Sequence, residues 1–365
     1  MIKKRIGKLQ ASLRRRKLDA ILITEPYNRR YLSGYTAADH GIQETSGVLL
    51  IPATGIPYLL TDSRFVLQAE EEAQGFTVEL YPKGLYPRLK QLMPGLDIQR
   101  LGFESHYFLH SSVAKMKKMA DAIDVELVPL TGLVEGMRVI KTEDEIRILK
   151  KSVLLNERVF LLVYNTIDPG MTEIEIALAL ELTMRELGAE GPSFDTIVAF
   201  GTNAAKPHAV PTERVLKSGD IVLVDMGLVL QGYCSDMTRT FVAGKPDTTY
   251  LERLRVVRKA QLAGINAIRA GAVCREVDRA AREVIVNAGY GDFFGHGLGH
   301  GVGLAVHEEP RLGPRSRKKL RAGMIVTIEP GIYLPEWGGI RLENMAVVRE
   351  DGCEVLNEDT SGLDL

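Results

Sequence analysis

Residues 295–307 read Gly-His-Gly-Leu-Gly-His-Gly-Val-Gly-Leu-Ala-Val-His, and this segment directs the interpretation of the whole chain. It contains three of the seven histidines, His296, His300 and His307, together with five glycines. So much glycine disfavours a helix, but it permits tight turns and a close approach of the backbone to a ligand. We therefore expect one of these histidines to bind a metal ion and the others to contact substrate or transfer protons. The alternative is that one or two of them are hydrogen-bonded core residues.

Two aspartates precede this segment in a strand-like context. Asp225 ends the apolar run 221–224, and Asp236 follows eleven residues later inside the strand-like segment 232–242. If residues 227–231 form part of a hairpin, adjacent strands bring the two carboxylates together. Ionised carboxylates at short distance repel each other unless a cation lies between them. Taken alone, the same two acids could instead be solvated or could cap turns.

Two glutamates follow it in similar settings. Glu329 comes directly after the apolar run 324–328, and Glu343 comes directly after residues 339–342. An unpaired carboxylate in such a place costs on the order of several kcal/mol. Four acids and one neutral imidazole carry a formal charge of −4, which balances two divalent cations. Such oxygen-rich ligation favours Mn²⁺, with Co²⁺, Fe²⁺ or Zn²⁺ as other choices.

Composition narrows the class of protein. The 365 residues suit two domains, with 45% hydrophobic and 25% charged residues as in a soluble globular protein. A formal net charge of −1 argues against a nucleic-acid binder, and no apolar stretch is long enough to cross a membrane. The three cysteines form no CxxC pair and suit a reducing compartment, so we expect a cytoplasmic protein.

The first third of the chain alternates between helical and strand-like segments. Residues 1–18 carry eight Lys or Arg, and Ile2, Ile6, Leu9 and Leu13 fall on one face of a helix. We prefer a first amphipathic helix to a transit peptide, which has a similar charge profile. The pattern predicts an α/β domain over 1–130. Its expected strands are 20–23, 47–51, 57–60, 77–81 and 100–104, with helices at 63–74 and 82–93.

A second domain is expected over 131–365. Thr142 and Thr172 each precede a glutamate by three residues, as in a capping box, and should open helices that reach about Tyr164 and Gly188. Turn-punctuated strands follow, broken by helices near 249–269 and 275–288. The chain has no H-E-x-x-H zincin motif, P-loop, serine-hydrolase elbow or G-x-G-x-x-G fingerprint.

The order of these residues resembles the pita-bread metallopeptidases, and most closely their aminopeptidase P and prolidase branch. The resemblance covers essentially the whole chain. It rests on the two aspartates, on His-Gly-Val-Gly-Leu-Ala-Val-His-Glu-Glu-Pro at 300–310, on Glu-Pro-Gly at 329–331 and on Arg-Leu-Glu at 341–343. Residues 192–195 and 205–211 also match. The resemblance implies a creatinase/prolidase-like α/β N-terminal domain and an α+β pita-bread catalytic domain. One departure is Asn344, where the branch often has Asp; it removes no ligand.

The resemblance also implies roles for individual residues. Asp225 would hold one metal ion, Asp236 and Glu343 would bridge two, and His300 and Glu329 would complete the second. A metal-bridging hydroxide would then cleave Xaa-Pro peptide bonds. His208, His307 and Glu329 would be catalytic, and His296, Arg311 and Arg341 would contact the substrate, a peptide with proline at its second position. A homodimer is implied as well.

Other members of the fold provide alternatives. Methionine aminopeptidases share the Asp–Asp and His–His spacings, but they normally lack the N-terminal domain and separate their two glutamates by more than the fourteen residues found here. Creatinase works without metal and does not keep this ligand set. A non-catalytic peptide-binding relative would typically have lost ligands. Whether the substrate is a dipeptide or a longer peptide stays open.

Overall fold

The computed structural model describes residues 1–358 and consists of two compact units, Met1–Met137 and the chain from Arg138 onward. The sheets and the hydrophobic cores of the described residues each lie within a single unit. The predicted boundary after residue 130 falls slightly earlier, at the end of the last strand of the first unit. No helix in the described range is both long and apolar enough to cross a membrane.

The first unit contains a six-stranded mixed sheet of order β4-β3-β2-β1-β5-β6. Its strands are β1 Ala20–Ile23, β2 Val48–Pro52, β3 Tyr58–Thr61, β4 Thr77–Leu80, β5 Arg100–Glu104 and β6 Glu126–Leu130. The helices are α1 Ile2–Arg15, α2 Pro26–Ser33, α3 Val66–Glu72, α4 Leu85–Gly95 and α5 His110–Asp121. The short helix α6 Glu135–Arg138 ends at Arg138, the first residue of the second unit. The α/β character is confirmed, although α2, α5, α6 and β6 were not expected.

The opening helix confirms the amphipathic pattern. Ile6, Leu9 and Leu13 of α1 are buried, while the basic residues lie on the other side. Strand β1 is buried along its whole length because it lies in the middle of the sheet, between β2 and β5. An apolar run without polar alternation is typical of such a central strand.

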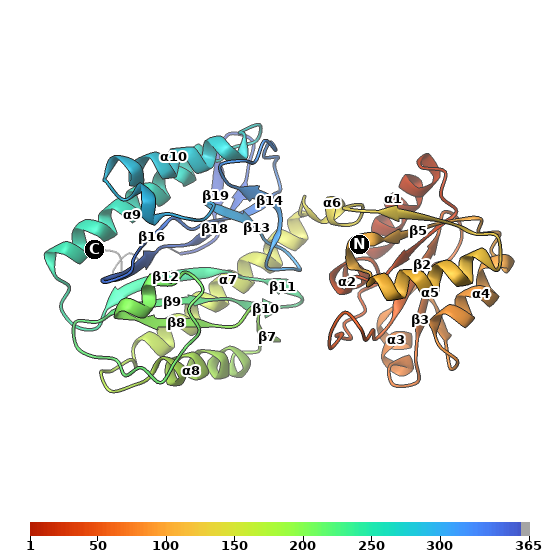
Figure 1. Ribbon diagram of the computed structural model, residues 1–365, viewed down its shortest axis with the longest axis horizontal. Coiled ribbons are helices and arrows are strands. Elements are labelled where there is room, and N and C mark those ends of the chain that lie inside the picture. The colour runs from red at the N-terminus through yellow and green to blue at the C-terminus, as the bar shows by residue number, and fades with distance from the viewer. Residues whose placement is uncertain (359–365) are drawn as a thin grey trace. The chain divides into compact units, whose positions relative to one another are not determined.

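The second unit stacks strands between two pairs of helices (Figure 1). Helices α7 Glu143–Tyr164 and α8 Glu173–Glu186 pack against one set of strands. Helices α9 Thr248–Ala267 and α10 Cys274–Asn287 pack against the other set. Two hydrophobic cores result, one beneath each helix pair. This layered arrangement is the expected α+β catalytic fold.

Both capping boxes are confirmed. The Thr142 hydroxyl accepts a hydrogen bond from the Glu145 amide, and the Glu145 side chain reaches back to the Thr142 amide. Thr172 and Glu175 make the same reciprocal pair at the start of α8. These side chains satisfy amides that have no partner inside the first turn, so each helix begins at a defined residue.

The described strands of this unit form four small sheets, with orders β11-β10-β7, β12-β9-β8, β14-β13-β15-β18-β19 and β16-β17. Those of the first two are β7 Gly191–Pro192, β8 Ile197–Phe200, β9 Ile221–Met226, β10 Leu228–Leu230, β11 Tyr233–Cys234 and β12 Met237–Val242. The remainder are β13 Gly299–Gly301, β14 Glu308–Leu312, β15 Ile325–Ile328, β16 Gly331–Leu334, β17 Gly338–Arg341, β18 Asn344–Val348 and β19 Cys353–Val355.

The expectation of one continuous strand over 232–242 is wrong. The chain pairs as β11 with β10 and then, after a break at Ser235 and Asp236, as β12 with β9. The Ser235 amide donates to the Leu228 carbonyl oxygen, and the Leu228 amide donates to the Ser235 hydroxyl. A Cβ on Gly227 would lie 2.1 Å from the Ser235 carbonyl oxygen. This close approach, which only glycine permits, moves the chain from one sheet to the next. Asp236 therefore precedes a strand instead of lying within one.

Candidate metal centre

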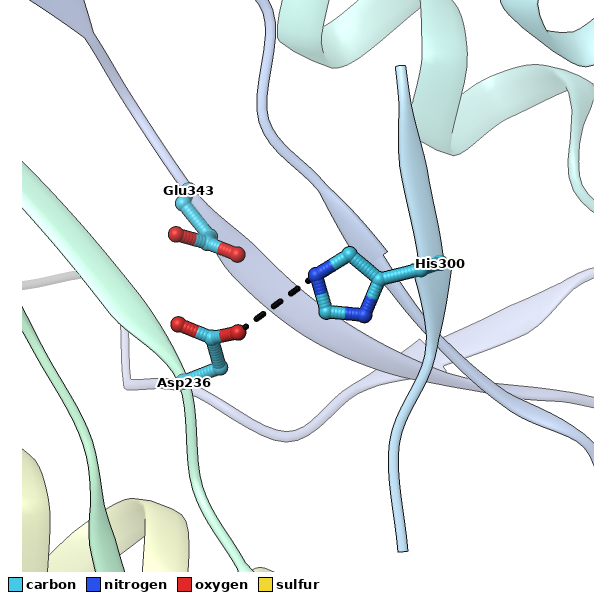
Figure 2. A group of neighbouring side chains, drawn as sticks. All are labelled: Asp236, His300 and Glu343. Atoms are coloured by element: carbon cyan, nitrogen blue, oxygen red, sulfur yellow. Dashed lines mark ion pairs between the residues drawn. The ribbon is translucent and has the colours of Figure 1, made fainter. Parts of the chain in front are cut away.

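A group of polar side chains meets at the ends of several strands in the second unit. One ligand atom each of Asp236, His300 and Glu343 lies within 4.8 Å of the others. Figure 2 shows the three side chains pointing toward one another from three separate segments of the chain. The Glu329 Oε1 atom is 3.4 Å and the Asp236 Oδ2 atom 3.6 Å from His300 Nε2. The fold thus brings together acids that are more than a hundred residues apart in sequence.

Asp225 belongs to the same neighbourhood. It lies in β9 opposite Thr238 of β12, so it is close to the start of β12 and to Asp236. One of its carboxylate oxygens accepts a hydrogen bond of 2.7 Å from Arg341 Nη2. The other, Oδ1, is buried and has no hydrogen-bond partner within the described residues. A buried carboxylate oxygen without a partner is costly, and a bound cation would satisfy it.

His300 is oriented for metal ligation. Its Nδ1 lies 3.0 Å from the Gly301 carbonyl oxygen, which can only accept a hydrogen bond, so Nδ1 is inferred to carry the proton. The lone pair of Nε2 then faces Asp236 and Glu329. Burial is the main cause that lowers the pKa of His300 to about 3, so the ring is neutral near pH 7. A ring nitrogen fixed through its second nitrogen is the usual arrangement of a metal-binding histidine.

The carboxylates repel one another in the absence of a cation. Burial raises the pKa of Asp236, and the charges of Asp225 and Glu329 raise it further. Burial likewise raises the pKa of Glu329 to about 7 and that of Glu343 well above its usual value. Together with the partnerless Asp225 oxygen and the neutral imidazole, this donor set fits divalent cations.

Two threonines hold the acids in place, and sequence reasoning missed both. Thr238 donates to Glu343 Oε2 at 2.7 Å and accepts from Arg341 Nε at 2.9 Å. Thr327 donates to Glu329 Oε1 at 3.1 Å and accepts from the His300 amide at 3.0 Å. Thr238 lies two residues after Asp236, and Thr327 two before Glu329. Side chains two apart in an extended segment share a face, so this spacing was the available signal.

Arg341 connects the acids to a second histidine. Its Nη1 donates to the Tyr333 hydroxyl, which lies 2.8 Å from His296 Nε2. The other ring nitrogen of His296 lies 2.8 Å from the Gly297 carbonyl oxygen. Burial lowers the pKa of His296 to about 4, so the neutral ring accepts from Tyr333. Both nitrogens of His296 thus have partners inside the protein, and a substrate-binding role for it stays a prediction. No sequence motif indicated Tyr333.

The acids lie in a cleft of about 980 Å³ within the second unit. His208, His296, His307, Arg311 and Arg341 also line it, so the structure brings all of the predicted site residues to one cleft. His307 contacts His300 edge-on, with ring centroids 4.4 Å apart. Arg311 is paired with His300 across the β13–β14 ladder. Burial lowers the pKa of His307, and the nearby Arg311 and His208 lower it further.

The segment that carries His208 depends on a buried glutamate outside the cleft. Glu173, at the first turn of α8, accepts hydrogen bonds from the Phe200 amide at 2.7 Å and from the Thr212 amide at 2.9 Å. It also accepts from the Asn203 and Thr212 side chains. One carboxylate therefore fastens both ends of residues 200–212. Sequence analysis assigned Glu173 no role.

Comparison with known proteins adds to this geometry. Residues 147–350 match the model of metallopeptidase family M24, and residues 5–140 match the creatinase/prolidase N-terminal domain. The chain belongs to metallopeptidase family M24. It is accordingly a hydrolase of the metallopeptidase class, with the two-domain architecture predicted from its sequence. The predicted membership of the prolidase and aminopeptidase P branch is confirmed.

Several solved structures are similar to this chain over almost its full length. An Xaa-Pro dipeptidase from Bacillus anthracis is 40% identical, with a TM-score of 0.91 and 98% of each chain covered. An X-Pro aminopeptidase from Thermotoga maritima is 36% identical, with a TM-score of 0.86 and 94% of this chain and 96% of that chain covered. A prolidase from Pyrococcus horikoshii is 33% identical, with a TM-score of 0.87 and coverages of 97% and 98%.

Proposed function

We propose that this protein hydrolyses the peptide bond that precedes proline, in Xaa-Pro dipeptides or at the N-terminus of longer Xaa-Pro peptides. The observation that carries the proposal is the buried cluster of acids around the neutral His300, with an unsatisfied Asp225 oxygen, in a cleft that can hold a peptide. Relatives named for Xaa-Pro cleavage, which are similar over almost the whole chain, support this substrate class.

Two divalent cations would be held by the five predicted ligands. We propose that Asp225 binds one ion, that Asp236 and Glu343 bridge the two, and that His300 and Glu329 complete the other. The carboxylate oxygens favour Mn²⁺, with Co²⁺, Fe²⁺ or Zn²⁺ as other choices. Arg341 orients Asp225 through a hydrogen bond of 2.7 Å, and Thr238 orients Glu343 through another of the same length.

When bound, the two ions would polarise the scissile carbonyl group and lower the pKa of a water molecule. The residues of the chain position and protonate the substrate. His307, whose ring contacts His300 in the cleft, would donate a hydrogen bond to the oxyanion that forms at the scissile carbonyl. His208 and Glu329 would transfer a proton to the departing prolyl nitrogen. Proline requires such a dedicated site because its nitrogen has no N–H to donate.

Substrate recognition would use the basic and histidine residues of the cleft. Arg311 is exposed in the cleft and can bind a carboxylate of the peptide. His296 and Arg341 also line the cleft, where both contact the Tyr333 hydroxyl, and they would contact the substrate. We also propose that the protein is cytoplasmic and forms a homodimer, as its branch of the family implies.

Turnover of defined peptides tests this proposal. The full chain is stripped of metal, loaded with Mn²⁺ or Co²⁺, and assayed on Ala-Pro, on an Ala-Pro tripeptide and on Ala-Ala. We expect hydrolysis of at least one proline substrate and none of Ala-Ala. The ratio of the two proline substrates then distinguishes a dipeptidase from an aminopeptidase. A metal-loaded sample that cleaves no Xaa-Pro peptide would contradict the proposal and favour a peptide-binding protein.

Two variants test the residue roles. His307→Ala should lower kcat by roughly 10²- to 10⁴-fold and leave the metal content unchanged, because it removes a hydrogen-bond donor or proton carrier and no ligand. Asp236→Ala should lose both ions, because it removes a bridging ligand. Elemental analysis measures the metal content. Metal loss from His307→Ala, or two ions retained by Asp236→Ala, would refute the corresponding role.

A further inference from the structure

A buried ion cluster lies directly beside His307, outside the group of acids. The Glu308 carboxylate accepts a hydrogen bond from Arg138 and another, of 2.9 Å, from Lys141 Nζ. The side chains of Glu308 and Arg138 are each 6% exposed, and that of Lys141 is 2% exposed. Burial acts to raise the pKa of Glu308, but the charges of Lys141 and Arg138 outweigh it and lower the pKa below its usual value. Two cations thus hold one carboxylate in its ionised form.

The same carboxylate shapes the loop that leads to His307. The Ala305 amide donates to Glu308 Oε1 at 3.2 Å. A Cβ on Gly303 would lie only 2.5 Å from Glu308 Oε2, so the loop passes over the carboxylate at a distance that only glycine allows. The other side of the loop is fastened by Cys234, whose amide donates to the Gly303 carbonyl oxygen at 2.8 Å. Residues 303–306 are therefore held between Cys234 and Glu308.

His307 depends on this loop for its position. Among the described residues, no hydrogen bond to a ring nitrogen of His307 fixes the imidazole, and its ring contact is with His300. The backbone on its N-terminal side is therefore what determines where the ring lies. The backbone on its other side begins β14 at Glu308 itself. A shift of the Glu308 side chain would move both flanks of His307.

A buried ion cluster is not by itself evidence of added stability. Well-packed apolar residues in such places are often equally or more stabilising, whereas loss of one partner leaves an uncompensated charge. The Glu308 carboxylate joins three groups from two separate segments, Arg138 and Lys141 on one side and the Ala305 amide on the other. An apolar side chain cannot make these three directional contacts.

We propose that Glu308 is a positioning residue for His307, with its carboxylate clamped by Arg138 and Lys141 and fixing the loop that places the imidazole in the cleft. The inference rests on the proposed function, because it acts through the role given there to His307. Small displacements of a reacting group, on the order of 1 Å, can lower a rate by about 10²-fold. We therefore expect Glu308→Gln to lower kcat by roughly 10- to 100-fold, with KM and metal content nearly unchanged.

Two further variants separate positioning from stability. Glu309→Gln is the matched control, because the neighbouring Glu309 is about half exposed and pairs with Lys318 at the surface. The double variant Glu308→Gln, Lys141→Met restores the net charge of the cluster, since one anion and one cation are lost together. It should recover much of the melting temperature lost by Glu308→Gln, yet kcat should stay low because the clamp is missing.

The measurements are kcat and KM on an Xaa-Pro peptide, melting temperature and metal content for all four proteins. Recovery of kcat together with melting temperature in the double variant would show a merely structural role and overturn the proposal. A kcat for Glu308→Gln no lower than that of Glu309→Gln, or a loss of metal, would overturn it as well. If the wild type cleaves no Xaa-Pro peptide, crystal structures of the wild type and of Glu308→Gln test the positioning role without an activity assay. A His307 ring that is displaced in Glu308→Gln, beside an unmoved His300, supports the positioning role, and an unmoved His307 refutes it.

Discussion

Replacing Asp236 by asparagine should change the stability of the protein in opposite directions with and without metal. In the metal-free protein, ligand atoms of Asp236 and Glu343 lie within 4.8 Å of each other. Two unit charges at that distance repel by about 3.5 kcal/mol at an effective dielectric constant of about 20. Because the raised pKa values of both groups leave part of the cluster protonated, we expect the neutral amide to stabilise the metal-free protein by about 1–2 kcal/mol, roughly half of the full repulsion.

The metal-loaded protein should behave in the opposite way. A ligand at about 100 times its dissociation constant stabilises the folded state by about 2.7 kcal/mol, and the variant should lose this gain. One kcal/mol corresponds to a shift in melting temperature of about 2–4 °C for a unit of this size. Asp236→Asn should therefore melt a few degrees above the wild type in EDTA and several degrees below it in excess Mn²⁺.

Thermal unfolding in EDTA and in Mn²⁺, with elemental analysis of each sample, checks this prediction. Asp195→Asn is the matched control, because Asp195 lines the same cleft but lies outside the group of acids. It should change neither melting temperature by more than about 1 °C, as expected for a surface substitution. The reasoning is refuted if Asp236→Asn melts below the wild type in EDTA, or if Mn²⁺ stabilises both proteins equally.

Three further predictions concern the residues that support the site and the first unit. Thr238→Val removes the hydroxyl that donates to Glu343 and should weaken metal affinity by about 10- to 100-fold, measured by Mn²⁺ titration. Glu173→Gln places an amide NH₂ group among hydrogen-bond donors, so the segment that carries His208 should become less firmly held. We expect kcat/KM to fall by about tenfold and hydrogen exchange over residues 200–212 to become faster. Glu104, in the first unit, has a pKa that burial raises from 4.5 to about 7, so its contribution to stability is present below pH 4.5 and is lost as the pH rises through 7. The difference in unfolding free energy between wild type and Glu104→Gln should thus fall by up to about 3 kcal/mol from pH 4.5 to 8, measured by hydrogen exchange of β1 amides.

Each of these predictions has an outcome that contradicts it. Thr240→Val, in the same strand, removes a hydroxyl that bonds the Arg341 backbone and no acid, so an equal loss of Mn²⁺ affinity there would remove the special role of Thr238. If hydrogen exchange over residues 200–212 is unchanged in Glu173→Gln, the segment keeps its structure without the Glu173 carboxylate. A pH-independent difference for Glu104→Gln would mean that Glu104 has the same pKa in the folded and unfolded chains.

The sequence identified the candidate site because of where its acids occur. Glu329 directly follows the apolar strand β15, and Glu343 lies two residues beyond β17 in a buried segment. A charge in such a place is costly unless something binds it. The same reasoning failed for Asp236, which was assigned to a strand interior. The hydrogen bonds between Ser235 and Leu228 end β11 just before Asp236. Leu228 lies outside residues 232–242, so the residue pattern of that segment could not indicate the break. The capped helices α7 and α8 were predictable because their signals are local.

Hydrogen bonds and ion pairs between segments that are distant in sequence could not be predicted from the sequence. Tyr333 contacts His296 and Arg341 because β16 and β17 pair, and neither the residue types nor their spacing in the sequence indicates these contacts. Glu308 belongs to the motif at residues 300–310, but its partners Arg138 and Lys141 lie more than 160 residues earlier in the chain. Long-range pairings of this kind are set by tertiary packing. The roles of the predicted ligands themselves stay predictions until metal content is measured.

The layered second unit has a consequence for how the protein survives without metal. Asp225 belongs to the strands covered by α7 and α8, whereas His300 and Glu329 belong to those covered by α9 and α10. Cations held among them would act as a cross-link between the two halves, much as a disulfide ties distant segments. Loss of metal should then speed global unfolding and expose the chain to proteases. Metal supply would in this way control how long the protein persists, in addition to its catalytic rate.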